Sequence, residues 1–168
     1  MSYATALDLI TRFDAEEIAQ RADRIMPRRV FGPLLTAVAS SADLSDYDVD
    51  EVAQAGVAMI RVQRALDDAR DAINSYISSK YSLPIFPVPA ILQRLACDLA
   101  RFYLYDDTAT EQVKDRHTAA MKLLDDVRAG KAQLGADAAT GEQPPSSAGA
   151  ELVSGERVWQ RDRSKGFI

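Results

Sequence analysis

Residues 81–105, YSLPIFPVPAILQRLACDLARFYLY, decide the fold because they join a proline-rich segment to an amphipathic helix. Each of the three prolines fixes its own φ and favours extended geometry in the residue before it, so we expect a stiff, extended connector. After Pro89, which suits the first turn of a helix, apolar side chains recur at helical spacing. They are Ile91, Leu92, Leu95, Ala96, Leu99, Phe102 and Tyr103. The stretch therefore predicts an elbow that leads into a long helix.

A second long helix is predicted before the elbow, from about residue 57 to 81. Its apolar side chains step by three or four residues and so form one stripe along one face. The stripe consists of Val62, Leu66, Ala69, Ile73, Tyr76 and Ile77. A third helix is predicted after the elbow helix, because Thr108 and Glu111 have capping-box spacing and Gly130 is a typical stop.

The N-terminal region predicts two short helices, one capped by Thr5 with Asp8 three residues on, the other capped by Asp14. Residues 26–56 mix a basic pair, a Gly-Pro break and an acidic cluster. We expect an irregular insert there, with one short helix or strand at 34–39. The predicted fold class is all-α, a small helical bundle with an extended, flexible C-terminal arm.

Three parts of the chain differ in composition. Residues 1–134 carry the apolar periodicity and form the predicted helical domain, with the insert at 26–56. Residues 135–156 are mostly Gly, Ala, Ser, Pro and Thr, a composition typical of a flexible linker. Residues 157–168 return to an aromatic and basic composition, which predicts a docking arm.

The arm contains the single tryptophan of the chain. Trp and Arg side chains dominate binding hot spots, so we expect the arm to contact another chain. The candidate contact residues are Trp159, Arg161, Arg163, Lys165 and Phe167. The alternative is that the arm returns to its own domain as an edge strand.

The sequence offers little for catalysis. It lacks the glycine-rich nucleotide loops, the zinc motif HExxH, the CxxC pair and the GxSxG nucleophile motif. His117, the single histidine, lies on an apolar helical stripe and predicts packing or an interface. Cys97, the single cysteine, is interpreted as a small buried apolar residue because no base is predicted beside it. We expect no enzyme activity and no cofactor.

An acidic run, SDYDVDEV at 45–52, resembles the start of a calcium-binding EF-hand loop. However, Glu51 stands where the loop needs glycine, and Val57 stands where it needs glutamate. We therefore expect an acidic, solvated loop and no metal site.

The net charge of −5 argues against binding DNA over the whole surface, since phosphate affinity comes from clustered Lys and Arg. No apolar run approaches the roughly 20 residues that span a bilayer, and the N-terminus lacks a signal-peptide pattern. A single cysteine fits a reducing compartment. We expect a soluble, intracellular protein without membrane contact.

Four segments together resemble a known family: MSYATALDLITRF, ALDDARDAINSYISSKYSLPI, PVPAILQRLACDLARFYLYDD and the closing WQRDRSKGF. They are similar to the Mu-type phage virion protein family, whose members resemble the head–tail connector (adaptor) proteins of long-tailed phages. The resemblance covers about residues 1–25, 57–135 and the last dozen. Residues 26–56 depart from it, because family members usually have only a short acidic, Gly-rich loop at this place.

The resemblance implies a structural adaptor subunit of the phage neck that is not an enzyme. It implies a homo-oligomeric ring of about twelve copies below the portal protein, which extends the channel for double-stranded DNA without sequence-specific binding. A downstream neck or tail-completion protein would bind this ring, and the arm would dock on the portal or a neighbouring subunit. The implied location is the virion, with assembly in the host cytoplasm.

Two other functions stay open from the residues alone. A small phage DNA-binding or packaging-associated regulator would need a basic recognition helix, whereas the predicted long helices mix both charges. An enzyme would be restricted to carboxylate chemistry, such as the adjacent pairs 106–107 and 125–126.

Overall fold

The computed structural model describes residues 2–135, and within this range every regular element is helical. The elements are α1 Ala6–Arg12, α2 Ala15–Ala22, α3 Gly32–Ala39, α4 Val49–Ile77, α5 Ala90–Tyr105, the short 3₁₀ helix η1 Asp106–Thr108 and α6 Glu111–Arg128. The predicted all-α class is confirmed. The linker 135–156, apart from its first residue, and the arm 157–168 lie outside the described residues.

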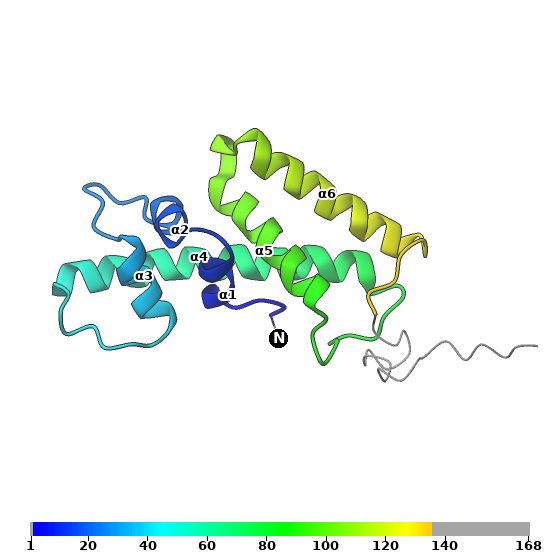
Figure 1. Ribbon diagram of the computed structural model, residues 1–168, viewed down its shortest axis with the longest axis horizontal. Helices are drawn as coiled ribbons and strands as arrows, with labels where there is room; N and C mark the ends of the chain where they lie inside the picture. Colours follow the sequence, from blue (N-terminus) through cyan, green and yellow to red (C-terminus); the bar gives the residue numbers. More distant parts are fainter. Residues whose placement is uncertain (1, 136–168) are drawn as a thin grey trace, which may run out of the picture.

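Helix α4 is the longest element and runs the length of the described fold (Figure 1). Helices α5 and α6 pack beside its C-terminal part, while α1, α2 and α3 gather toward its N-terminal part. The predicted stripe is the inward face, since five of its members are buried: Val62, Leu66, Ala69, Ile73 and Ile77. One continuous apolar core thus connects all six α-helices.

Helix α4 begins at Val49 rather than near residue 57. Asp48 is its N-cap and Glu51 completes a capping box, because each side chain accepts a hydrogen bond from the other residue's backbone N–H. About half of the predicted irregular insert is therefore regular. Helix α3 confirms the short element expected at 34–39, and residues 49–56 form the first two turns of α4. Half of the acidic run lies inside the helix start and satisfies backbone donors that a helix leaves unpaired.

The N-terminal helices begin where the sequence predicts. Thr5 and Asp8 form a capping box, and the Asp14 side chain accepts from the Glu16 backbone N–H. Helix α3 then crosses α2 closely, because a Cβ on Gly32 would lie 2.9 Å from the Glu16 nitrogen. The Gly32 N–H donates to the Glu16 carboxylate at 2.7 Å, which fixes this crossing.

The proline elbow bends between α4 and α5 instead of running straight, and the peptide bonds before Pro84 and Pro87 are cis. Ile85 points into the core and is 2 % exposed. Pro89 is the N-cap of α5, one position before the first turn. The elbow therefore joins two packed helices and is itself held by the core.

Helix α6 differs from the prediction at its start and agrees at its end. Thr110 is the N-cap, whereas Thr108 lies in η1 and donates to the Tyr105 carbonyl. At the other end Gly130 has φ +76°, and the backbone N–H groups of residues 130 and 131 donate to the carbonyls of residues 127 and 126. This pair of bonds is a Schellman motif, so the predicted glycine stop is confirmed.

None of the helices within residues 2–135 is both long enough and apolar enough to cross a bilayer.

Candidate interaction surfaces

The first half of α4 carries an apolar stripe on its outward face. We call Val49, Ala53, Val57 and Ile60 the α4 stripe; successive members are three or four residues apart and so share one side of the helix. Val49 is 82 % exposed and Ile60 is 54 % exposed. Gly56 adds a dent beside them, since a Cβ there would meet nothing within 4 Å. Exposed apolar side chains that share one face mark a surface for contacts.

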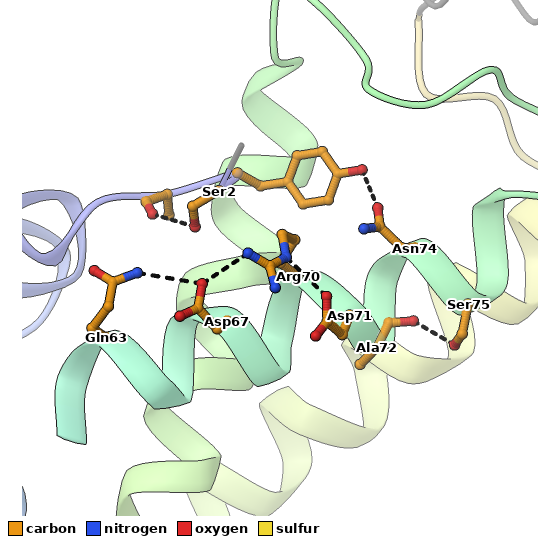
Figure 2. Close-up of polar contacts among 10 residues, drawn as sticks. Ser2, Gln63, Asp67, Arg70, Asp71, Ala72, Asn74 and Ser75 are labelled. Atoms are coloured by element: carbon orange, nitrogen blue, oxygen red, sulfur yellow. Dashed lines mark hydrogen bonds and ion pairs between the residues drawn. The ribbon is translucent and has the colours of Figure 1, made fainter. Parts of the chain in front are cut away.

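The same outward face becomes polar farther along α4 (Figure 2). Arg70 bridges two carboxylates, with Asp67 at 2.9 Å and Asp71 at 2.8 Å. Asn74 then accepts a hydrogen bond from the Tyr3 hydroxyl, which ties the N-terminal segment to α4. The α4 stripe therefore ends at a definite boundary near Gln63.

The segment between α2 and α3 lies against the first half of α4. The Gln54 amide donates to the Pro27 carbonyl, and Arg29 pairs with Asp50 at 3.0 Å. This segment exposes Ile25 and Met26, the latter 84 % exposed. The apolar surface at this end of the molecule thus includes more than the helix itself.

Asp23 organises that segment from a buried position. Its carboxylate accepts from the backbone N–H groups of Ile25, Arg29 and Val30 and from the Gln54 amide. Burial alone would raise the pKa of Asp23, but these hydrogen bonds outweigh it and lower the pKa below its ordinary value. The ionised carboxylate therefore holds the loop against α4.

An arginine-lined groove of about 680 Å³ opens between α2, α4 and α5. Its basic side chains are Arg21, Arg24, Arg61 and Arg64, and its acidic ones are Asp68, Asp106 and Asp107. Arg24 pairs with Asp106 at 3.4 Å, and Arg61 donates to the Ala22 carbonyl at 2.8 Å. Arg21 also lies over the Tyr105 ring, 4.3 Å from its centroid. The groove is therefore of mixed charge, and three of its arginines already serve intramolecular contacts.

A buried ion pair lies beside this groove and joins α5 to α2. Arg101 donates to both Glu17 oxygens, at 2.6 and 2.9 Å. Its guanidinium also lies over the Phe13 ring, 4.4 Å from the centroid. Two bonds and a ring contact fix the geometry of this arginine, so it positions the N-terminal helices on the bundle.

The proline elbow exposes two apolar side chains, Leu83 and Phe86, which we call the knob. Phe86 is 66 % exposed and Leu83 is 39 % exposed, next to Pro84 and Pro87. The knob follows the C-terminal end of α4, whereas the α4 stripe starts at its N-terminal end. Two exposed apolar surfaces therefore lie on different parts of one subunit.

The predicted contact residues of the arm, Trp159, Arg161, Arg163, Lys165 and Phe167, lie outside the described residues, and their contact role stays a prediction. His117 packs as predicted, since its ring stacks on the Phe102 ring with 3.9 Å between the two centroids. Burial lowers the pKa of His117. Cys97 is buried as predicted, and burial raises the pKa of its thiol to about 12.

The described residues contain no group of three or more His, Cys, Asp or Glu side chains placed to hold a metal ion. The acidic run instead caps α4 through Asp48 and Glu51, and Asp43 accepts from Ser45.

Sequence reasoning missed the α4 stripe and the arginine groove for different reasons. The stripe begins within the predicted irregular insert, although the Asp48–Glu51 capping-box spacing is a visible signal for an earlier helix start. The groove combines arginines from helices about 40 residues apart, so only the tertiary fold brings them together.

The fold and these surfaces define a small all-α protein whose described features are exposed apolar and charged faces. The family model described as "Bacteriophage Mu, Gp36" matches residues 3–154. The chain is 39 % identical over 108 residues to the Mu-like prophage FluMu protein gp36 of Haemophilus influenzae. The aligned region covers 64 % of this chain and 76 % of that protein. It is 33 % identical over 106 residues to gene product J of Escherichia phage Mu, or 63 % and 74 % of the two chains.

The chain therefore belongs to the bacteriophage Mu Gp36 family, and the resemblance to a Mu-type phage family is confirmed.

Proposed function

We propose that the protein is a structural head–tail connector (adaptor) subunit of the phage neck, without enzyme activity. In this role about a dozen copies form a ring below the portal, extend the DNA channel and receive the next neck or tail component. The virion is then its final location. Membership of a phage Mu family supports this proposal, together with the exposed apolar surfaces on a fold held by a continuous core.

The position of the two apolar surfaces carries the argument. A closed ring built from head-to-tail contacts needs two different faces on every subunit, each of which contacts a different neighbouring subunit. The knob with Phe86 and the α4 stripe supply two such faces at separate places. A subunit with a single exposed patch would favour a two-fold dimer instead.

The charge distribution argues against the alternative, a small DNA-binding or packaging-associated regulator. Such a protein needs a basic stripe or helix that neutralises several phosphates. The arginine groove gathers four arginines, yet three aspartates line it, and the smaller pocket with Arg12, Arg94 and Arg116 also contains Asp98. This balance suits a subunit that DNA passes without being bound.

The test is native mass spectrometry of the full-length chain mixed with the portal of its own phage. We expect multiple copies on each portal ring, and fewer copies for Phe86→Lys. Leu7→Lys is the matched control, because Leu7 is also exposed but belongs to α1 and not to the knob. Absence of any association with the portal would contradict the adaptor function, and salt-sensitive duplex binding by the isolated subunit would support the regulator.

A further inference from the structure

We propose that in the free subunit the C-terminal segment 157–168 binds the α4 stripe of its own chain. The inference concerns the free subunit and does not depend on the connector function. It starts from the α4 stripe and asks which segment of stated chemistry fits that surface.

The end of the α4 stripe at Val57 and Ile60 offers a contact surface for an apolar side chain. Val57 and Ile60 remain exposed, and the open space at Gly56, which precedes them on the helix, forms a dent next to them. A flat aromatic ring fits such a dent, because contact with a glycine brings the ring close to the backbone. Trp159 is the single tryptophan of the chain and supplies that ring.

The other end of the stripe is acidic. Asp46, Asp48, Asp50 and Glu51 lie within three residues of Val49 in the sequence, and the Asp50 side chain, which pairs with Arg29, is 75 % exposed. Residues 157–168 carry four basic side chains and one acidic one. The distance along the helix from Ile60 to Val49 is about 17 Å, the length of about five extended residues. With Trp159 at Ile60, an extended segment places Arg163 about 13 Å and Lys165 about 20 Å along, beside these carboxylates.

The length of the intervening chain favours the segment's own subunit. The described chain ends beside the C-terminal end of α4, because the Leu134 N–H donates to the Tyr81 hydroxyl at 3.1 Å. From Ile77 back to Ile60 the helix rises about 26 Å. Trp159 follows Gly135 by 24 residues, for which a Gly-rich chain has a mean span of about 27 Å.

A linker whose mean span matches the distance gives its segment an effective concentration in the millimolar range. At micromolar protein concentration, a second copy presents the segment at a concentration about a thousandfold lower. The same chain is therefore the preferred donor of the segment when the subunit is free. Binding covers the α4 stripe and keeps free subunits from associating through it.

The test is the fluorescence of Trp159 in the full-length protein, diluted over a hundredfold range. The reference for an exposed tryptophan is a synthetic peptide of residues 151–168. We expect emission at shorter wavelength than the peptide, unchanged on dilution, and shifted toward the peptide value at high salt because charge pairing is screened.

Ile60→Lys removes the apolar contact and repels the basic segment, so its emission is expected to match the peptide. Phe86→Lys is the matched control at an exposed site outside the stripe and is expected to keep the wild-type emission. Circular dichroism of both variants checks that the helices remain.

Three results would overturn the proposal: wild-type emission equal to that of the peptide, a shift that disappears on dilution, or a shift that persists in Ile60→Lys. Each is independent of whether the protein joins the portal in the mixing experiment.

Discussion

The outward face of α4 has two regions that differ in chemistry although they belong to one helix. Its first half presents Val49, Val57 and Ile60, whereas its second half presents the charged network of Asp67, Arg70 and Asp71. The inward face is apolar along both halves. Core packing therefore does not explain the outward difference. Water hydrates the charged half well, whereas contact with a partner would remove the apolar half of this face from water.

The sharpest test of this contrast compares the same substitution on the two faces. Ile73→Ala is expected to lower the free energy of unfolding by about 2–5 kcal/mol, because Ile73 is fully buried and its loss leaves a cavity. Ile60→Ala is expected to change it by no more than about 0.5 kcal/mol. Urea denaturation of both variants gives the two values. Similar losses would mean that Ile60 is packed and that the stripe is part of the core.

The next effect concerns the buried ion pair that holds the N-terminal helices. Arg101→Ala leaves the Glu17 carboxylate without its partner in a largely buried position. We expect a loss of about 3 kcal/mol in the free energy of unfolding. Arg70→Ala is the matched control on the exposed network, with an expected loss below about 1 kcal/mol. If the two losses were equal, Arg101 would not be the residue that positions these helices.

A smaller, pH-dependent effect is expected at Asp23. Because its folded pKa is lowered, its stabilisation is complete above the unfolded pKa of about 4 and is lost as the pH falls through the folded value. Asp23→Asn has one acceptor oxygen and turns an amide toward backbone donors, so we expect a loss of about 1–3 kcal/mol at pH 7. Denaturation at pH 7 and pH 3 should show this loss shrinking in acid. A loss that is the same at both pH values would exclude the carboxylate charge as its cause.

The smallest effect compares two glycines. Gly56→Ala is expected to stabilise the protein by about 0.5–1 kcal/mol, because it lies inside α4 with open space around it. Gly130→Ala is expected to destabilise it by about 1 kcal/mol or more, because φ is +76°. Thermal unfolding ranks the two variants against the parent chain, all three truncated after residue 135 so that Trp159 cannot occupy the space at Gly56. A destabilising Gly56→Ala would mean that this space is not open.

The elements with a sustained helical period could be predicted from the sequence. The second half of α4, α5 and most of α6 follow their apolar stripes, and the caps at Thr5 and Asp14 follow local chemistry. The start of α6 could not be fixed, because Thr108 and Thr110 are both acceptable caps and the tertiary fold selects the second. The start of α4 was missed because Val49 and Val57 face outward and add nothing to the buried stripe.

The candidate surfaces could not be predicted from local sequence. Ile85 and Phe86 lie between the same prolines, yet Ile85 is 2 % exposed and Phe86 is 66 % exposed. The groove needs Arg21 and Arg61 to meet across two helices. The fixed position of Arg101 likewise depends on Glu17, 84 residues away. Long-range pairs of this kind leave no periodic signal in a single sequence.

The burial of Cys97 has a practical consequence for spectroscopy. With a pKa of about 12 and 1 % exposure, its thiol is almost entirely protonated and sheltered near neutral pH. Maleimide dyes and spin labels will therefore react slowly with the native protein. A cysteine engineered at the exposed position 26 or 86 can be labelled selectively while Cys97 stays in place. Distances between such probes can then be measured without first removing the natural thiol.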